Sequence, residues 1–407
     1  MTDAIKKPIS HWPLLMLLAV SVLVNYMDRG NLSVAAPILT DELNLTPERM
    51  GTLLSAFFWT YASFQLVAGW LVDRYDVSRV YAAGYFLWSA ATLGIGLVGG
   101  FASLLVLRLV LGIGESVAYP AYSKILSSKF KEEERGLANA VIDAATKFGP
   151  ALGTYLGGWM IASYGWRSFF VVTGAVTLIW LIPWLMVAPR EQVADKHLTK
   201  GPGWGAILSK KEAWATFFGL FCFNYNWYFL LTWLPSYLVK ERHFTMTMMA
   251  FYSALPLTAT AFATLAAGWY SDRLIARGAK VDTVRRRFLI TGLLISGICL
   301  PFVNTPHHWL SMSLVLVNFI GIGLYTSNSW ALTQYIAGPA ASGQWTGWQN
   351  AIGNMAGVVA PVITGFIVGR LGSFQLAFVA SSVVVFAGVA VYQWMLGRVE
   401  PVEWAAQ

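Results

Sequence analysis

Apolar stretches of about 20 residues recur along the whole chain and constrain its fold more than any other feature. Of the 407 residues, 57% are hydrophobic and only 12% are charged, whereas soluble domains contain about 25% charged residues. A run of roughly 20 apolar residues is long enough to cross about 30 Å of hydrocarbon as an α-helix. The chain is therefore expected to be an all-α membrane protein that sits in a lipid bilayer.

Twelve transmembrane helices are predicted, in two groups of six. The first group is expected at residues 12–38, 48–72, 80–98, 102–128, 135–162 and 166–187. The second group is expected at residues 213–239, 246–271, 286–304, 308–336, 343–370 and 374–396. The longest hydrophilic stretch lies between the groups. The predicted organisation is thus an N-terminal half (1–188), a linker (189–211) and a C-terminal half (212–407).

Lys and Arg residues gather in the loops of one side, namely the N-terminus, the linker and the loops after the second, fourth and eighth helices. Because positively charged short loops stay in the cytoplasm, both termini and the linker are expected there. The same basic residues are scattered over short loops. The net charge of +8 therefore does not indicate a nucleic-acid-binding domain.

Other functional classes find little support. Cys222 and Cys299 lie in apolar spans and are expected to be small buried hydrophobes, with no disulfide framework and no metal site. No cleavable signal peptide is predicted, because the first apolar stretch has full span length. No Gly-x-x-x-x-Gly-Lys-Ser/Thr loop is seen, so ATP-driven transport, a bound nucleotide or another cofactor is not expected. No catalytic set is visible, and we predict a monomer that is not an enzyme.

A short motif repeats about half a chain apart. The second helix ends in Gly69-Trp70-Leu71-Val72-Asp73-Arg74, and the eighth ends in Gly268-Trp269-Tyr270-Ser271-Asp272-Arg273. Two six-helix halves joined by a polar linker are the parallel-repeat architecture of secondary transporters, pseudo-symmetric about an axis along the membrane normal. The four charged residues of these motifs are expected to act as conformational latches at the cytoplasmic helix ends: Asp73, Arg74, Asp272 and Arg273.

Charged residues inside the predicted spans mark the candidate site. They are Asp28, Arg29, Arg108, Glu115, Asp143 and Lys147. Each ionised side chain at the bilayer centre costs at least ~2.5–3.5 kcal/mol, so such residues are rare and usually functional. Their presence predicts a protein that handles a charged solute or protons.

Over its full length the chain resembles the major facilitator superfamily, through the two Gly-x-x-x-Asp-Arg loops. Within it, two in-membrane motifs resemble the anion:cation symporter family: Asn25-Tyr26-Met27-Asp28-Arg29 and Arg108-Leu-Val-Leu-Gly112-Ile-Gly114-Glu115. The loop motif is typical of the whole superfamily, whereas the in-membrane motifs are more specific. The family includes bacterial galactonate, glucarate and hexuronate carriers and vertebrate vesicular glutamate and sialic-acid carriers. The resemblance therefore implies a twelve-helix carrier of organic anions in a bacterial inner membrane.

Arg29 and Arg108 are the candidate anion anchors, because a guanidinium stays protonated and offers a planar fork to a carboxylate. The alternative for each is an ion pair that only holds helices together. The resemblance implies that Arg29 binds the substrate carboxylate. For Arg108, a role in steadying Asp28 across helices remains open.

Asp28 and Glu115 are the candidate proton sites. Burial favours the neutral form of a carboxyl group and a nearby arginine favours the ionised form, so protonation would free the arginine for a substrate anion. The resemblance implies proton coupling at both positions, and a static ion pair is the alternative. Because adjacent residues point about 100° apart on a helix, Arg29 is expected to face the cavity and Asp28 to turn toward the fourth helix and Arg108.

Three further residues of the N-terminal half are candidates for substrate binding. Tyr26 lies one turn before Arg29, and Tyr61 lies near the middle of the second helix. The resemblance supports a hydrogen bond from each phenol to the solute, although core packing would also explain Tyr61. Lys147 either forms a neutralising i, i+4 pair with Asp143 or adds positive potential to the cavity.

The C-terminal half carries neutral polar groups in place of charges. Its candidate substrate-binding residues are Asn224, Asn226, Trp330, Gln349 and Asn350. Buried amides can equally bridge helices in lipid. Charge in one half and amides in the other suit a solute that has a carboxylate at one end and hydroxyls at the other, such as an aldonate, aldarate or hexuronate.

The resulting hypothesis is a proton-coupled symporter that imports a sugar acid by alternating access. An organic-anion exchanger or uniporter for dicarboxylates or aromatic acids is the main alternative, and a drug/proton antiporter of the same fold is another. A membrane sensor is disfavoured because no soluble signalling domain is visible.

Overall fold

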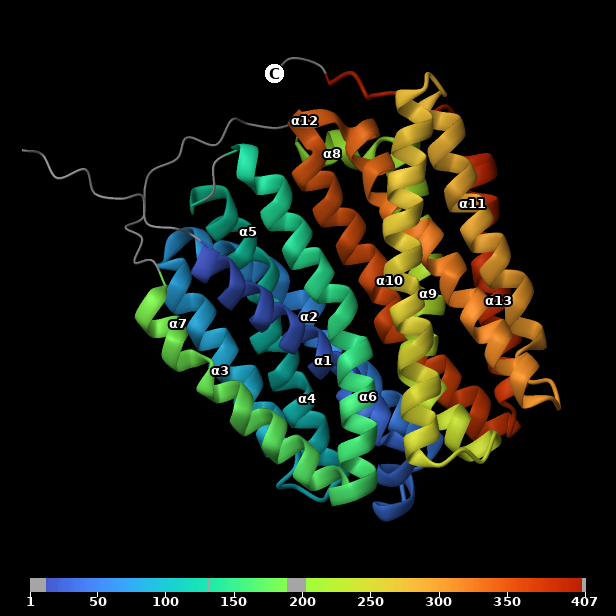
Figure 1. The fold of residues 1–407 in the computed structure, drawn as a ribbon. Helices are drawn as coiled ribbons and strands as arrows, with labels where there is room; N and C mark the ends of the chain where they lie inside the picture. The colour runs from blue at the N-terminus through green and yellow to red at the C-terminus, as the bar shows by residue number, and fades with distance from the viewer. Residues whose placement is uncertain (1–11, 130–131, 189–202, 405–407) are drawn as a thin grey trace, which may run out of the picture.

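The computed structural model describes residues 12–129, 132–188 and 203–404, with some side chains inside these ranges not described, and the secondary-structure elements within them are all helices (Figure 1). The N-terminal half contains α1 (Trp12–Glu42), α2 (Pro47–Arg74), α3 (Val77–Ile95), α4 (Phe101–Ser116), α5 (Ala118–Lys129), α6 (Glu132–Ile179) and α7 (Leu181–Val187). The C-terminal half contains α8 (Trp204–Leu208), α9 (Lys211–Ser236), α10 (Met246–Ala276), α11 (Val281–Cys299), α12 (His308–Leu371) and α13 (Phe374–Ala390). Short helical turns, η1 (Tyr237–Glu241), η2 (Leu300–Phe302) and η3 (Val391–Met395), extend α9, α11 and α13.

Two of these helices each contain two membrane spans. The backbone of α6 leaves helical geometry at Gly165 (φ 79°), and that of α12 does so at Gly338 (φ 65°). Both angles lie in the left-handed region that glycine adopts without strain. With these two breaks, and with α4 and α5 forming one span, the described helices make the twelve that the sequence predicts. Among the described residues, seven helical segments are long and apolar enough to cross a membrane by length and composition alone.

Most helix ends lie within a few residues of their predicted positions, and the differences have local causes. The third helix begins at Val77 and not at 80, because Asp76 caps it by accepting a hydrogen bond from the Arg79 backbone N–H at 2.9 Å. The ninth begins at Val281 and not at 286. There an Arg286–Asp282 pair four residues apart supports an extra polar turn. The predicted linker falls mostly outside the described residues, and its described part includes α8.

The two halves stand side by side in Figure 1, the first coloured blue to green and the second green to red. Each has its own aromatic core. In the N-terminal half Tyr85 stacks on Trp180 with ring centroids 4.1 Å apart. In the C-terminal half Phe223 stacks on Tyr325, also at 4.1 Å. Such rings supply large buried area in a membrane bundle and fix the helices within each half.

The halves touch each other where α1 ends and α2 begins. A Cβ atom on Gly51 would lie 2.5 Å from the carbonyl oxygen of Pro361, and one on Gly365 would lie 2.6 Å from that of Pro47. Glycine therefore lets α2 and the second span of α12 touch backbone to backbone. We call this region the closed end.

Two ion pairs bridge the halves at the closed end. The Lys240 Nζ lies 2.6 Å from the Asp41 Oδ1, and the Arg370 Nε lies 3.5 Å from the Glu48 Oε1. Close to it, α6 meets α10, and Gly158 packs against Ala250 (Figure 1). In this structure the two halves are therefore in direct contact at the closed end.

Candidate functional site

Four charged residues form the centre of the N-terminal half. Asp28 and Arg29 come from α1, and Arg108 and Glu115 come from α4; we call them the charged quartet. The side chains of Arg29 and Glu115 are 8% and 0% exposed, and Asp28 and Arg108 are buried as well. Arg108 interacts electrostatically with both carboxylates. Because charges this deeply buried require partners, the quartet is a single electrostatic unit.

Arg29 makes the direct ion pair of the quartet. Its Nε donates to the Glu115 Oε2 at 3.1 Å, and its Nη2 donates to the Tyr61 hydroxyl at 2.9 Å and to the Asn25 Oδ1 at 3.2 Å. The rings of Tyr26 and Tyr61 lie 4.3 and 4.6 Å from its guanidinium carbon. Arg29 was expected to face the cavity, and this stays a prediction; in the structure its long side chain also reaches Glu115 of α4, which neutralises it.

Asp28 takes a different partner from the one expected. Its Oδ1 accepts a hydrogen bond from the Asn31 side chain at 2.7 Å. Arg108 is near enough to interact with it electrostatically, but the Arg108 Nε donates to the backbone carbonyl of Leu53 at 3.3 Å. The structure describes no direct Asp28–Arg108 ion pair, so Arg108 acts on Asp28 through a longer-range electrostatic interaction.

Two residues of this site were not among the site residues predicted from the sequence. The Phe57 ring lies between the two arginines, with its centroid 5.7 Å from the Arg29 guanidinium carbon and 5.3 Å from that of Arg108. Asn25 accepts a hydrogen bond from Arg29 one turn away. The i, i+4 spacing of Asn25 and Arg29 could have revealed this contact. Nothing local distinguishes Phe57 from other apolar residues of α2.

The C-terminal half meets this site through Tyr228 of α9, which was not among the predicted site residues. Its ring packs against Phe58 of α2 at a centroid distance of 4.5 Å, and it interacts electrostatically with Arg29. The Tyr228 hydroxyl donates to the Asn354 Oδ1, and the Asn354 Nδ2 donates to the Asn350 Oδ1 at 2.9 Å. A polar chain of neutral groups therefore leads away from the quartet toward Asn350.

The other predicted residues of the C-terminal half lie in differing surroundings. Asn350 and Trp330 are half-buried. Asn224 is buried beside Gly353. Gln349 is fully buried, and its Oε1 accepts a hydrogen bond from Thr333 at 2.6 Å.

Asn226 is engaged within its own half. Its amide donates to Asn318 of α12 at 3.3 Å and accepts from Ser381 of α13 at 3.4 Å. These contacts are those of a residue that joins helices.

Lys147 is half-buried on α6. The side chains of Asp143, Asp73 and Arg74 lie outside what the structure describes, so their predicted roles stay predictions. At the second repeat motif, Asp272 pairs with Arg285 of α11 at 2.6 Å and not with its neighbour Arg273. Arg285 also donates to Asn328 of α12 at 2.9 Å. This motif therefore ties three helices of one half together.

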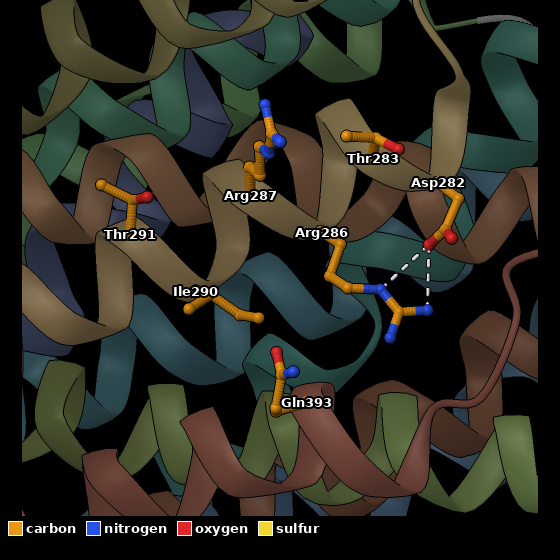
Figure 2. Close-up of a pocket in the computed structure, with 7 residues that line it drawn as sticks. All are labelled: Asp282, Thr283, Arg286, Arg287, Ile290, Thr291 and Gln393. Atoms are coloured by element: carbon orange, nitrogen blue, oxygen red, sulfur yellow. Dashed lines mark hydrogen bonds and ion pairs between the residues drawn. The ribbon is translucent and has the colours of Figure 1, made fainter.

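Two open cavities lie away from the quartet, on α11. The larger has a volume of about 470 Å³ and the smaller about 390 Å³. Figure 2 shows the larger one, with Arg286 turned toward Asp282 and Arg287 extending from the opposite side of the helix. These cavities lie at the polar end of α11 and not between the halves. Among the described residues, no group of three or more His, Cys, Asp or Glu side chains could hold a metal ion.

Comparison with known proteins agrees with the twelve-helix architecture. The family model described as Major Facilitator Superfamily matches residues 18–343 and 274–406. The chain belongs to the major facilitator superfamily. It is thus a multi-pass membrane transporter and not an enzyme, and its all-α fold consists of twelve helices in two pseudo-symmetric halves.

Several curated relatives are similar over nearly the whole chain. A probable sulfoacetate transporter of Cupriavidus necator is 30% identical, covering 90% of this chain and 89% of the relative. The D-galactonate transporter of Escherichia coli O6:H1 is 30% identical, covering 95% and 96%. A solved structure of a bacterial homologue of the human lysosomal transporter Spinster, in an inward-facing and occupied conformation, superposes with a TM-score of 0.81. It is 18% identical and covers 95% of this chain and 97% of that structure.

Proposed function

We propose that this protein is a proton-coupled symporter that imports a sugar acid, such as an aldonate, aldarate or hexuronate, across a bacterial inner membrane. The two halves rock around a site at mid-depth and expose it alternately to each side. The basic loops would hold both termini in the cytoplasm. The closed end would then face outward, and the structure would represent an inward-facing state.

The observation that carries this proposal is the Arg29–Glu115 ion pair. A buried guanidinium that already holds a carboxylate at 3.1 Å is suited to hold a different carboxylate in its place. The phenol of Tyr61 and the amide of Asn25 complete the contacts around Arg29. In this scheme the Glu115 carboxylate occupies the substrate-anion binding position at Arg29 while the carrier is empty.

Proton coupling follows from the charge of the quartet. With both carboxylates ionised, the two arginines and two carboxylates sum to zero. Protonation of Glu115 removes the partner of Arg29 and leaves one positive charge for the substrate anion. Protonation of Asp28 adds a second. Binding of the anion and binding of protons therefore favour one another, which is reciprocal linkage between two sites.

The solute class is inferred from the C-terminal half and from the relatives. Neutral amide and hydroxyl groups on Tyr228, Asn350 and Asn354 can bind the hydroxyls of a sugar acid. The D-galactonate transporter supports this class. The probable sulfoacetate transporter supports a second candidate, a small carboxylate that bears a sulfonate.

Purified protein in liposomes with an inward proton gradient tests the function. We expect the wild-type protein to accumulate galactonate, glucarate or a hexuronate, and sulfoacetate serves as the competing solute. A carrier that only exchanges anions would show counterflow but no accumulation driven by the gradient.

Glu115→Gln tests the ion-pair switch. This variant should lose gradient-driven accumulation but keep anion exchange, because its Arg29 is permanently unpaired. The exposed Glu403→Gln is the matched control and should behave like the wild type. Accumulation at the wild-type level in Glu115→Gln would exclude Glu115 as a proton site.

A further inference from the structure

The two cavities on α11 meet at the same side chains. Arg287 and Thr283 line both of them, and Lys280 lines the smaller one. All three residues are exposed. Figure 2 shows the Arg287 guanidinium turned away from the Arg286–Asp282 pair. Donor groups of three kinds, guanidinium, ammonium and hydroxyl, are therefore gathered around one hollow.

Two of these groups carry positive charge that no carboxylate neutralises. The Arg286 Nη2 lies 2.9 Å from the Asp282 Oδ1, so these two lining residues cancel each other. Arg287 and Lys280 form no ion pair in the part of the chain that the structure describes. Topology explains why basic residues lie at this end of the helix. It does not explain why two unpaired ones lie at the wall of a cavity.

The larger cavity continues the seam between α11 and α13. Farther along α11 the two helices touch, because a Cβ atom on Gly297 would lie 3.1 Å from the Phe386 ring. Toward the polar end of α11, Ile290 and Gln393 instead face the cavity together. The hollow thus lies where α11 and η3, the extension of α13, move apart.

One face of α11 passes from polar to apolar along its length. Thr283, Arg287 and Thr291 follow each other at intervals of four residues and are all exposed. Ile298, about three turns beyond Arg287 on the same face, is 56% exposed. In a membrane span, an exposed apolar side chain faces lipid. The face therefore presents charge and hydroxyls at its end and an apolar surface toward the bilayer interior.

This combination matches an amphiphile better than a soluble anion. Arginine, lysine and threonine can all donate to the oxygens of a phosphate. A soluble anion would use these donors but not the apolar face beside them. A phospholipid uses both, and one with net negative charge neutralises the unpaired cations. Basic pockets between transmembrane helices bind such headgroups in other membrane proteins.

We propose that the cavities at Arg287 bind the headgroup of an anionic phospholipid. Its phosphate accepts hydrogen bonds from Arg287, Lys280 and Thr283, and its acyl chains lie along the exposed face of α11. Gln393 bounds the same hollow from η3, so the bound lipid joins the ends of α11 and α13. The orientation proposed above places this lipid in the cytoplasmic leaflet.

Native mass spectrometry of the full-length protein in detergent, titrated with phosphatidylglycerol or phosphatidylethanolamine, tests the site. We expect phosphatidylglycerol to bind more tightly. Lys280→Gln/Arg287→Gln should weaken its binding about 10- to 100-fold, in keeping with the loss of charge-assisted hydrogen bonds. The control Arg277→Gln/Arg398→Gln removes two charges from the same end that line neither cavity, and it should bind within about twofold of wild type. Equal losses in the two double variants, or equal binding of the two lipids, would overturn the site.

Two further arms separate the cavity from its charge and the lipid from a free anion. Gln393→Trp fills part of the larger cavity and keeps every charge, so it should also weaken phosphatidylglycerol binding; unchanged affinity would overturn the role of the cavity. Excess inorganic phosphate should not displace the lipid, and full displacement would indicate a site for a soluble anion instead.

These measurements involve no transport. A protein that binds phosphatidylglycerol but accumulates no sugar acid would refute the proposed function and leave the lipid site intact.

Discussion

The two halves share one architecture but bury different kinds of polar group, charged in the first half and neutral in the second. The N-terminal half buries a charged quartet in which Arg29 pairs with Glu115. The facing part of the C-terminal half carries a chain of neutral groups, Tyr228, Asn354 and Asn350. Its described arginine–carboxylate pairs within the half, Arg285–Asp272 and Arg286–Asp282, lie at helix ends and not at mid-depth.

This difference implies that the affinity for an anion and the selectivity among solutes are set by different halves. A buried ion pair is sensitive to the loss of one partner, since the remaining charge is left uncompensated. A neutral hydrogen bond contributes less but depends on the exact position of its partner. We infer that the N-terminal half decides whether an anion binds, and that the C-terminal half decides which one.

The largest expected effect comes from Arg29→Lys. Lysine keeps the charge but cannot form the fork that contacts Glu115, Tyr61 and Asn25 together. Loss of charge-assisted hydrogen bonds worth about 1.5–3 kcal/mol should weaken substrate binding about 10- to 100-fold. Isothermal titration with the transported sugar acid measures this change. Unaltered affinity would mean that the N-terminal half does not anchor the anion, and the contrast between the halves would fail.

A smaller effect is expected from Tyr228→Phe, which keeps the ring contact with Phe58 but removes the hydroxyl that binds Asn354. A neutral hydrogen bond worth about 0.5–1.5 kcal/mol predicts a two- to tenfold loss of affinity for a sugar acid. A simple carboxylate without hydroxyls should be unaffected. Tyr225→Phe on the same helix is the control. Equal losses for both solutes would show that the C-terminal half does not discriminate between them.

The smallest effect is expected from Lys240→Gln, which breaks the bridge to Asp41 at the closed end. Exposed ion pairs contribute about 0–1 kcal/mol, so the equilibrium between closed and open ends should shift by only a few-fold. Distances between spin labels on α2 and α12 report this shift. Glu42→Gln breaks the exposed pair with Arg167 inside the N-terminal half and should leave the distances unchanged. A similar shift in both variants would mean that the bridge has no specific role between the halves.

The fold was largely predictable because the membrane imposes a strong pattern. In hydrocarbon, each spanning segment must satisfy its backbone hydrogen bonds internally, as a helix does. The length of an apolar run alone therefore locates the spans. The errors arose where polar residues continue a helix beyond the bilayer, as at the start of α11. There the Asp282–Arg286 pair supports a turn that hydrophobicity does not reveal.

The site was predictable as a set of residues but not as a set of contacts. Charge in an apolar span singled out Asp28, Arg29, Arg108 and Glu115 without reference to any neighbour. Which carboxylate meets which arginine depends on how α1 and α4 are rotated against each other, and helix rotation is set by packing across the whole half. For the same reason Tyr228 and Asn354, 126 residues apart, could not be paired from the sequence.

The neutrality of the charged quartet also bears on how membrane voltage acts on the carrier. Moving one elementary charge through 100 mV changes the free energy by about 2.3 kcal/mol. With Asp28 and Glu115 ionised, the empty site carries no net charge, so voltage does almost no work when the empty carrier reorients. A site that holds two protons and a monovalent anion carries one positive charge and is drawn toward a negative interior. Voltage would therefore accelerate the loaded step alone, and the return of the empty carrier would be electrically silent.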